Sequence, residues 1–278
     1  MSKFILPDFN HIDCLELKTK TNSLRYGRRL YYFQYQEKLC WLKMQMKQGH
    51  LMYQQGFQHE LAFYQESLSS TSLSSILLPC EIVSKAFVAS KGLEIDIEQS
   101  LTQMLILPHA VPYFTVSAQT LPIASIQYYL LRALDAIQVL HEAGWIHADL
   151  KPEHFVEYHG QVKLIDFEQV QSITQQVKTE INATPRYMAP ELFHGEVKTI
   201  QTDIYALGII FYEWLSGQRL SAKNYTDWAY LHCQRLQIEL PEKFLCFQPL
   251  LLKMLAKHKA ARFNNICAIK HALVSEIA

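Results

Sequence analysis

Residues 147–155 read HADLKPEHF, a stretch rich in side chains that could serve phosphoryl transfer. Asp149 could accept the proton of a substrate hydroxyl, and Lys151, two places on, could neutralise a phosphate. The polar residue three further on, His154, could reach a metal ion. Together these side chains could hold a substrate hydroxyl, a phosphate and a metal ion. The stretch carries two unusual letters, Ala148 before the Asp and the His at 154.

Two further motifs follow this loop along the chain. Residues 164–168 read LIDFE, in which Asp166 ends an apolar run, and residues 183–191 read ATPRYMAPE. The series resembles the protein kinase superfamily, whose motifs are H-R-D-L-K-x-x-N, D-F-G and A-P-E. With HADLKPEH, DFE and APE in their places, the chain resembles a divergent, bacterial-type Ser/Thr kinase over about residues 15–275.

Hydrophobic patterning predicts an α+β fold of two lobes with a cleft between them. We expect a β-rich N-lobe over 1–107, a hinge over 108–112 and an α-rich C-lobe over 113–278, which together resemble one protein kinase domain. Strands are predicted over 14–18, 29–36, 38–46, 77–83, 103–110 and 161–170. Helices are predicted over 50–67, with Phe57, Leu61, Tyr64 and Leu68 on one face, over 123–144, stopped by Gly144, and over 202–217, capped by Thr202 or Asp203.

The resemblance implies roles for the residues of these motifs. Asp149 would orient the substrate hydroxyl and accept its proton, and Lys151 would place positive charge beside the transferred phosphoryl group. Thr184, which in such kinases bonds back to the catalytic loop, and Lys151 both resemble the Ser/Thr type. Asp166 would bind the Mg²⁺ that bridges the phosphates.

Three later residues resemble the structural acids and base of this family. Asp203 sits where such kinases place a buried Asp. Glu191, the last letter of APE, and Arg262 of KAARF sit where such kinases place an ion pair. We expect that pair to be largely buried.

In the small lobe, Lys43 fits the strand Lys that contacts the α- and β-phosphates of ATP, and Glu60 fits its helix partner. Glu60 lies one turn from the inward-facing positions of its predicted helix, where a salt bridge to Lys43 is possible. A solvated Lys and a solvated Glu are the alternative. Lys38 and Lys47 compete with Lys43, but neither has the right apolar strand before it.

The phosphate-covering loop is the weakest match, because G-x-G-x-x-G is absent. Residues 19–30 contain one glycine, Gly27, about where the last glycine of that motif would fall. One glycine permits one close backbone approach to phosphate. Arg25, Arg28 and Arg29 could compensate through side-chain contacts to phosphate, or could form a solvated basic turn.

The adenine site departs from the family as well. Trp41 takes the place of the small Ala that packs on adenine, and its indole should point to the same face as Lys43. Either the adenine site is reshaped or the strand register slips. In the hinge, Leu107 would line the back of the pocket, while the Pro108 carbonyl and the Ala110 N–H would serve the adenine edge.

His154 replaces the Asn that usually holds a second metal ion. Imidazole nitrogen suits Mn²⁺ better than Mg²⁺, so metal binding is retained with an altered preference. The alternative is a His that only hydrogen-bonds within the loop. Ala148 removes the Arg that meets an activation-loop phosphate in many kinases, so activity should not await that phosphorylation. Glu168 replaces the Gly of D-F-G and adds an acid near the metal.

Composition limits the class of protein. With 278 residues, 49% of them hydrophobic, the chain can build a large core. Lys+Arg and Asp+Glu each total 26, so net charge gives no reason to expect nucleic acid as a partner. The six cysteines are scattered without a CxxC pair, as in reduced cytosolic proteins. No apolar run reaches membrane-spanning length, and residues 1–10 lack a signal-peptide cleavage site. We therefore expect a cytoplasmic protein without membrane insertion.

These observations predict an ATP-dependent Ser/Thr-type protein kinase that uses Mg²⁺ or Mn²⁺ and a protein substrate. Two alternatives stay open. The missing glycines, Trp41 and His154 favour a pseudokinase, a binding module without turnover. His154 also leaves open a kinase that acts on a sugar or small-molecule hydroxyl. Against that alternative, APE, Thr184 and Arg262 belong to peptide docking in the family.

Overall fold

The computed structural model describes residues 14–35, 38–67, 70–89, 95, 97–175 and 183–275. The chain divides into two compact units, Met1–Val111 and Pro112–Ala278. This division falls inside the predicted connection at 108–112. The exact lobe boundaries stay predictions. Within the described residues, none of the helices is long and apolar enough to cross a membrane.

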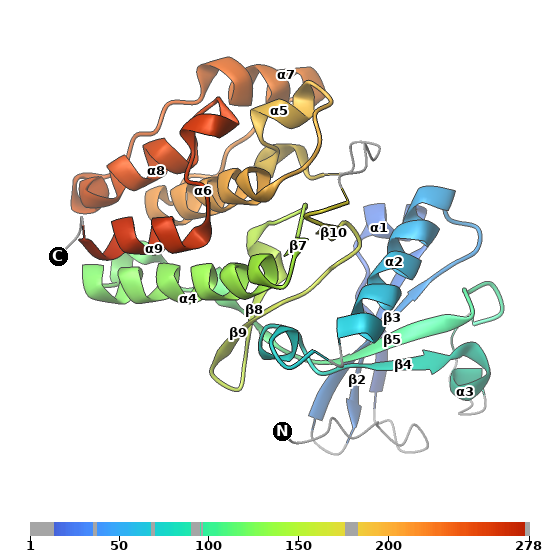
Figure 1. Ribbon diagram of the computed structural model, residues 1–278. Coiled ribbons are helices and arrows are strands. Elements are labelled where there is room, and N and C mark those ends of the chain that lie inside the picture. Colours follow the sequence, from blue (N-terminus) through green and yellow to red (C-terminus); the bar gives the residue numbers. More distant parts are fainter. Residues whose placement is uncertain are drawn as a thin grey trace. The chain divides into compact units, whose positions relative to one another are not determined.

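The first unit is built on a five-stranded antiparallel sheet in the order β1-β2-β3-β5-β4 (Figure 1). Its strands are β1 (Cys14–Leu17), β2 (Arg28–Tyr35), β3 (Lys38–Gln45), β4 (Glu81–Ser84) and β5 (Gln103–Pro108). Its helices are α1 (Thr21–Arg25), α2 (Leu51–Ser67), η2 (Leu73–Ser75) and α3 (Lys85–Ala89). The α+β prediction is confirmed here, with helices added to the strand-rich half.

Alternation along β3 sorts the residues of this unit between two faces. Cys40, Leu42 and Met44 point into a hydrophobic core that also receives Phe33 from β2 and Val88 from α3. The odd-numbered residues of β3 therefore face the other side of the sheet. In α2, the predicted helix face is confirmed, because Phe57, Leu61 and Tyr64 are buried, whereas Leu68 lies outside the described residues.

The second unit is mostly helical, with short strands that carry loops. Its longer helices are α4 (Ile123–Glu142), α6 (Ile200–Ser216), α8 (Gln248–Met254) and α9 (Ile266–Ser275). Helix α4 packs against α9, and α6 against α8 (Figure 1). The shorter elements are η3 (Tyr113–Thr115), η4 (Ala118–Thr120), β7 (Trp145–Ile146), η5 (Pro152–His154), β8 (Phe155–Tyr158), β9 (Gln161–Leu164), β10 (Gln171–Ser172), η6 (Pro185–Tyr187), α5 (Pro190–Phe193), α7 (Tyr225–Tyr230), the π-helix η7 (Leu231–Arg235), η8 (Glu242–Phe247) and η9 (Lys259–Ala261), and β6 (Val111–Pro112) lies at the division.

Two strand predictions were too long. The strand predicted over 77–83 begins only at Glu81. Pro79 explains part of this delay, because proline has no N–H to donate to a strand ladder. The strand predicted over 161–170 ends at Leu164, since Asp166 adopts a φ of 67°, which no strand residue has.

The cap predicted for α6 was also wrong. The helix begins at Ile200, so its N-cap is Thr199, and Thr202 is the third helical residue. The Thr202 hydroxyl accepts a hydrogen bond from the Thr199 N–H at 3.0 Å, which satisfies the backbone just before the helix. Asp203 therefore does not cap this helix. At the other end Gly217 adopts a left-handed φ of 69°, as a helix-terminating glycine does.

Candidate active site

The first unit brings Lys43 and Glu60 together. Lys43 lies on β3 and Glu60 on α2, and Nζ of Lys43 is 2.6 Å from Oε2 of Glu60. Their side chains are 8% and 1% exposed, so the pair is nearly shielded from water. The predicted contact is confirmed. Lys38 and Lys47 are exposed, which removes the two competing lysines. The role of Lys43 toward phosphates stays a prediction.

Trp41 does lie on the same sheet face as Lys43. In the register, Lys43 pairs with Leu105 and Trp41 pairs with Leu107, so the strand does not slip. The indole Nε1 of Trp41 donates a hydrogen bond to Nδ1 of His109 at 3.1 Å. Sequence reasoning missed this partner, because a contact across 68 positions has no local signal. A slip in the strand register is therefore excluded, and a reshaped adenine site stays a prediction.

The stretch expected to cover the phosphates contains the short helix α1 instead of an open loop. Gly27 follows it with a φ of 84°. A Cβ at this position would lie 2.6 Å from Nε2 of Gln45 and 2.9 Å from Cα of Gly49. Close packing thus explains the glycine. Contact of Gly27 with phosphate stays a prediction.

The three arginines around α1 differ in their engagement. Nη1 of Arg29 donates to the carbonyls of Leu24 at 3.1 Å and of Arg28 at 3.0 Å, so its guanidinium closes the end of the helix. Arg25 is exposed and Arg28 is half-buried. These backbone contacts therefore argue against Arg29 as a phosphate ligand.

In the second unit, Asp203 fixes the loop that carries Asp149. One carboxylate oxygen of Asp203 accepts from the Ala148 N–H at 2.9 Å. The other accepts from the His147 N–H at 2.8 Å and lies 2.9 Å from Nε2 of His141. These bonds hold Ala148 at a φ of 68°, a conformation that costs a non-glycine residue energy. Asp203 thereby stabilises the strained turn just before Asp149.

The carboxylate of Asp149 is oriented by two groups. Oδ1 accepts a hydrogen bond from the backbone N–H of Thr184 at 2.8 Å. Oδ2 lies 3.6 Å from Nζ of Lys151. The predicted bond from Thr184 to the catalytic loop exists, but the donor is the backbone rather than the hydroxyl. The three predicted catalytic residues thus lie together.

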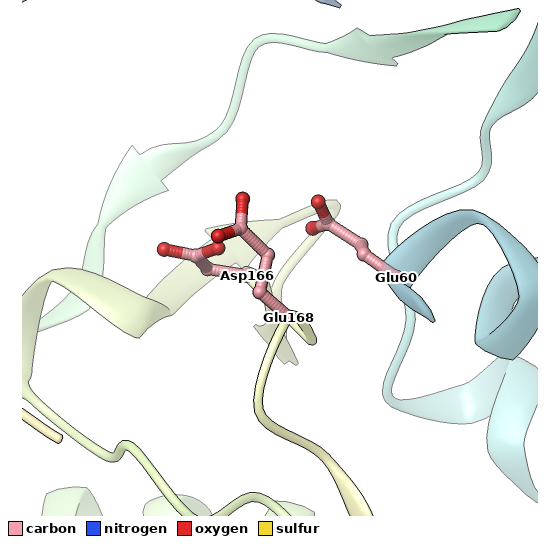
Figure 2. Close-up of side chains that lie close together, drawn as sticks. All are labelled: Glu60, Asp166 and Glu168. Atoms are coloured by element: carbon pink, nitrogen blue, oxygen red, sulfur yellow. The ribbon is translucent and has the colours of Figure 1, made fainter. Parts of the chain in front are cut away.

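Asp166 and His154 meet in the same unit. Nε2 of His154 is 3.1 Å from Oδ2 of Asp166, and His154 is buried. Figure 2 shows Asp166 and Glu168 on the loop after β9, where one carboxylate oxygen of each lies within 4.8 Å of the other. A carboxylate oxygen and an imidazole nitrogen are both atoms that a divalent cation can take as ligands, and Mn²⁺ accepts the nitrogen more readily than Mg²⁺ does.

The ring of His147 packs against the ring of His154. The two imidazole rings stack with centroids 5.2 Å apart, and Nε2 of His147 lies 3.2 Å from the carbonyl oxygen of Ile165. Burial, aided by the neighbouring His154, lowers the pKa of His147 to about 4. His147 is therefore neutral at physiological pH and adds no positive charge beside Asp166.

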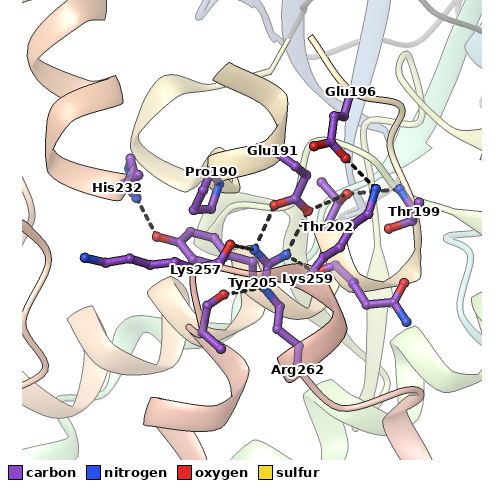
Figure 3. A network of polar contacts seen from close by, with 12 residues as sticks. Pro190, Glu191, Glu196, Thr199, Thr202, Tyr205, His232, Lys257, Lys259 and Arg262 are labelled. Carbon is purple, nitrogen blue, oxygen red and sulfur yellow. Dashed lines mark hydrogen bonds and ion pairs between the residues drawn. The ribbon is translucent and has the colours of Figure 1, made fainter. Parts of the chain in front are cut away.

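The ion pair predicted between Glu191 and Arg262 is confirmed (Figure 3). Nη1 and Nη2 of Arg262 each lie 2.7 Å from a carboxylate oxygen of Glu191. The Arg262 side chain is 0% exposed and the Glu191 side chain is 4% exposed. Arg262 also donates to the carbonyls of Ala256, Lys257 and Gln201. The pair ties the end of the 183–191 stretch to the segment after α8.

Lys198 is a buried cation that sequence reasoning missed. Lys198 is 5% exposed, and its Nζ lies 3.4 Å from Oε1 of Gln169. Burial lowers the pKa of Lys198, while the carboxylates of Asp149 and Asp203 oppose that shift. A single Lys in VKTIQ carries no motif, so only the fold reveals its place near the catalytic loop.

Comparison with known proteins agrees with this geometry. A model described as the protein kinase domain matches residues 97–274. A cGMP-dependent protein kinase of Toxoplasma gondii is 39% identical over 92 residues, 33% of this chain and 9% of that protein. The probable serine/threonine-protein kinase PknB of Lactococcus lactis is 39% identical over 89 residues, 31% of this chain and 14% of its own length. A putative serine/threonine-protein kinase of Acanthamoeba polyphaga mimivirus is 32% identical over 139 residues, 43% of this chain and 50% of its own. The chain thus spans half or less of these relatives.

Proposed function

The chain belongs to the protein kinase domain family, and from this premise we propose that it transfers the γ-phosphoryl group of ATP to a Ser or Thr hydroxyl of a protein substrate. The observation that best supports this proposal is the position of the Asp149 carboxylate, which accepts from the Thr184 N–H at 2.8 Å and lies 3.6 Å from Nζ of Lys151. A carboxylate fixed in this way can orient a hydroxyl and accept its proton.

The step proceeds by displacement at phosphorus. The substrate oxygen forms a bond to the γ-phosphorus, its proton passes to Asp149, and the bond to the β–γ bridging oxygen breaks, releasing ADP. Lys151 offsets negative charge on the transferred group. Lys43, aligned by Glu60, would hold the α- and β-phosphates. Asp166, with His154, would hold a divalent cation, which when bound neutralises phosphate charge.

Lys151 and Thr184 support the Ser/Thr type through the family resemblance, and the names of the bacterial and viral relatives point the same way. We also propose a cytosolic location. Among the residues whose side chains the structure describes, the following cysteines are free thiols, as is usual in a reducing compartment: Cys40, Cys80, Cys233, Cys246 and Cys267.

A nucleotide-binding module without turnover is the second candidate. One observation favours it: the Trp41 indole, bonded to His109 at 3.1 Å, lies on the sheet face that the base would use. The two candidates share the binding groups and differ in whether Asp149 acts on a hydroxyl.

The deciding experiment is phosphoryl transfer from labelled ATP to a generic protein substrate with Mg²⁺ or Mn²⁺. Asp149→Asn should lower the rate by at least about a hundredfold, the scale of lost general-base assistance, with little change in ATP binding. Asp135→Asn is the matched control, an exposed Asp on α4 paired with Lys270, and should stay active. Equal activity of wild type and Asp149→Asn would overturn the proposal, and ATP binding without transfer would favour the second candidate.

A further inference from the structure

An aromatic cluster occupies the sheet face beside Lys43 in the first unit. It consists of Tyr32 on β2, Trp41 on β3 and His109 just after β5. The ring centroids of Tyr32 and Trp41 are 4.9 Å apart, and those of Trp41 and His109 are 6.2 Å apart. Tyr32 also meets His109 edge-on at 5.7 Å. Each ring thus contacts the other two.

The cluster lies at a defined distance from the proposed phosphate contact. Trp41 precedes Lys43 by two residues on the same strand, so the two side chains emerge from one face roughly 7 Å apart along β3. A nucleotide whose phosphates reached Lys43 could extend its base along this face as far as Trp41. The indole therefore lies where the base would go.

We propose that Trp41 and His109 form a latch over the base subsite, so that a purine base enters only when the indole–imidazole hydrogen bond opens. This inference rests on the proposed function, because it concerns the same ATP. The latch makes Trp41 a specificity-determining residue that weakens ATP binding while leaving the triphosphate contacts intact.

The geometry favours a latch over a stacking platform for the base. A platform needs an indole face that is free to receive the base. Here Tyr32 packs against the indole with ring centroids 4.9 Å apart at an interplanar angle of 56°, so part of the ring is already covered. The hydrogen bond from the indole N–H to His109 holds the ring in this position. The backbone N–H of His109 is also engaged, donating to the Leu39 carbonyl at 2.7 Å. His109 is thus bound to β3 through both its side chain and its backbone.

The test measures the dissociation constants of ATP and of inorganic tripolyphosphate by titration calorimetry with Mn²⁺ present. Trp41→Ala should bind ATP at least about tenfold more tightly than wild type, because a hydrogen bond and aromatic packing no longer oppose the base. His109→Ala removes the hydrogen bond alone, so the gain should be about two- to tenfold. Tripolyphosphate has no base, and its affinity should be the same in all three proteins.

A matched control and a second readout keep the test independent of folding defects. Tyr128→Ala removes an exposed aromatic residue on α4 and should change neither affinity. In the wild type, Trp41 emission is isolated by subtracting the spectrum of Trp41→Phe. ATP should shift this emission to the red and increase its quenching by acrylamide, whereas tripolyphosphate should do neither.

Three results would overturn the latch. Weaker ATP binding by Trp41→Ala would show that the indole is a platform. A parallel gain for ATP and tripolyphosphate would show that Trp41 does not act on the base. Unchanged Trp41 emission while ATP binds would show that the ring does not move. Failure of every protein to bind either ligand would contradict the proposed function itself, and the latch with it.

Discussion

Nε2 of His154 lies 3.1 Å from Oδ2 of Asp166, so a buried imidazole and a carboxylate converge in the second unit. With a cation between them, the imidazole would offer a nitrogen lone pair and Asp166 an oxygen. Mg²⁺ prefers oxygen ligands and Mn²⁺ accepts imidazole more readily.

The first prediction concerns the choice of metal. The wild type should support faster phosphoryl transfer with Mn²⁺ than with Mg²⁺ at equal concentration. His154→Asn replaces the nitrogen ligand by an amide oxygen, so it should shift the ratio of the two rates toward Mg²⁺. The measurement is that ratio in both proteins. An unchanged ratio would mean that His154 only braces the catalytic loop.

A second prediction concerns the buried pair of the first unit. Lys43→Met should weaken ATP binding, and Glu60→Gln should weaken it less, because Glu60 acts by aligning Lys43 at 2.6 Å. The double variant should be no weaker than Lys43→Met alone, since the two residues act as a unit. Titration of ATP into the four proteins of the cycle measures this coupling. Additive losses would show that the pair does not act on the nucleotide jointly.

Residues whose partners are set by motif order could be predicted from the sequence. Lys43–Glu60 and Glu191–Arg262 are contacts between motifs. Helix periodicity placed Glu60 near the inward face of its helix, whereas the second pair was predicted from the family resemblance alone. The resemblance also predicted a bond from Thr184 back to the catalytic loop, but not that the Thr184 N–H donates to Asp149. The pattern of hydrophobic and polar residues therefore predicted the α+β class and the buried face of α2.

Contacts that depend on tertiary packing could not be predicted. The Trp41–His109 bond joins two segments far apart in sequence, and the burial of Lys198 arises only when the loop before α6 folds. Helix α1 is five residues long and too short for a periodic signal. For Gly27, the requirement comes from the neighbouring Gln45 and Gly49 rather than from a motif.

The third prediction concerns stability. Arg262→Met should lower the free energy of unfolding by about 3–5 kcal/mol, because the 4% exposed Glu191 would keep its charge without a partner. Denaturant unfolding measures this loss. Lys259→Met is the control, since Lys259 pairs with the exposed Glu196 in the same region (Figure 3) and should leave stability nearly unchanged. Equal losses in the two variants would show that the buried pair has no special role.

The last prediction uses the buried imidazole of His232 in the π-helix η7. It is fully buried, and its Nδ1 lies 2.9 Å from the hydroxyl of Tyr205. The rings of Phe193 and Trp228 stack on it, each with centroids 5.8 Å away, and the guanidinium of Arg186 lies over the Trp228 ring at 5.7 Å.

Burial lowers the pKa of His232 from 6.5 to about 4. As the pH falls below 6.5, the unfolded chain therefore takes up a proton that the folded chain refuses. The stability due to neutral His232 is complete above pH 6.5 and is lost as the pH approaches 4, by up to about 3 kcal/mol.

His232→Phe should flatten the dependence of unfolding free energy on pH across this window. Tyr205→Phe keeps the imidazole buried and should retain the slope. His147, whose pKa is also about 4, adds a slope of the same sign in every protein. The measurement is therefore the difference between wild type and His232→Phe from pH 7 to pH 4, and a difference that stays constant with pH would contradict the assignment.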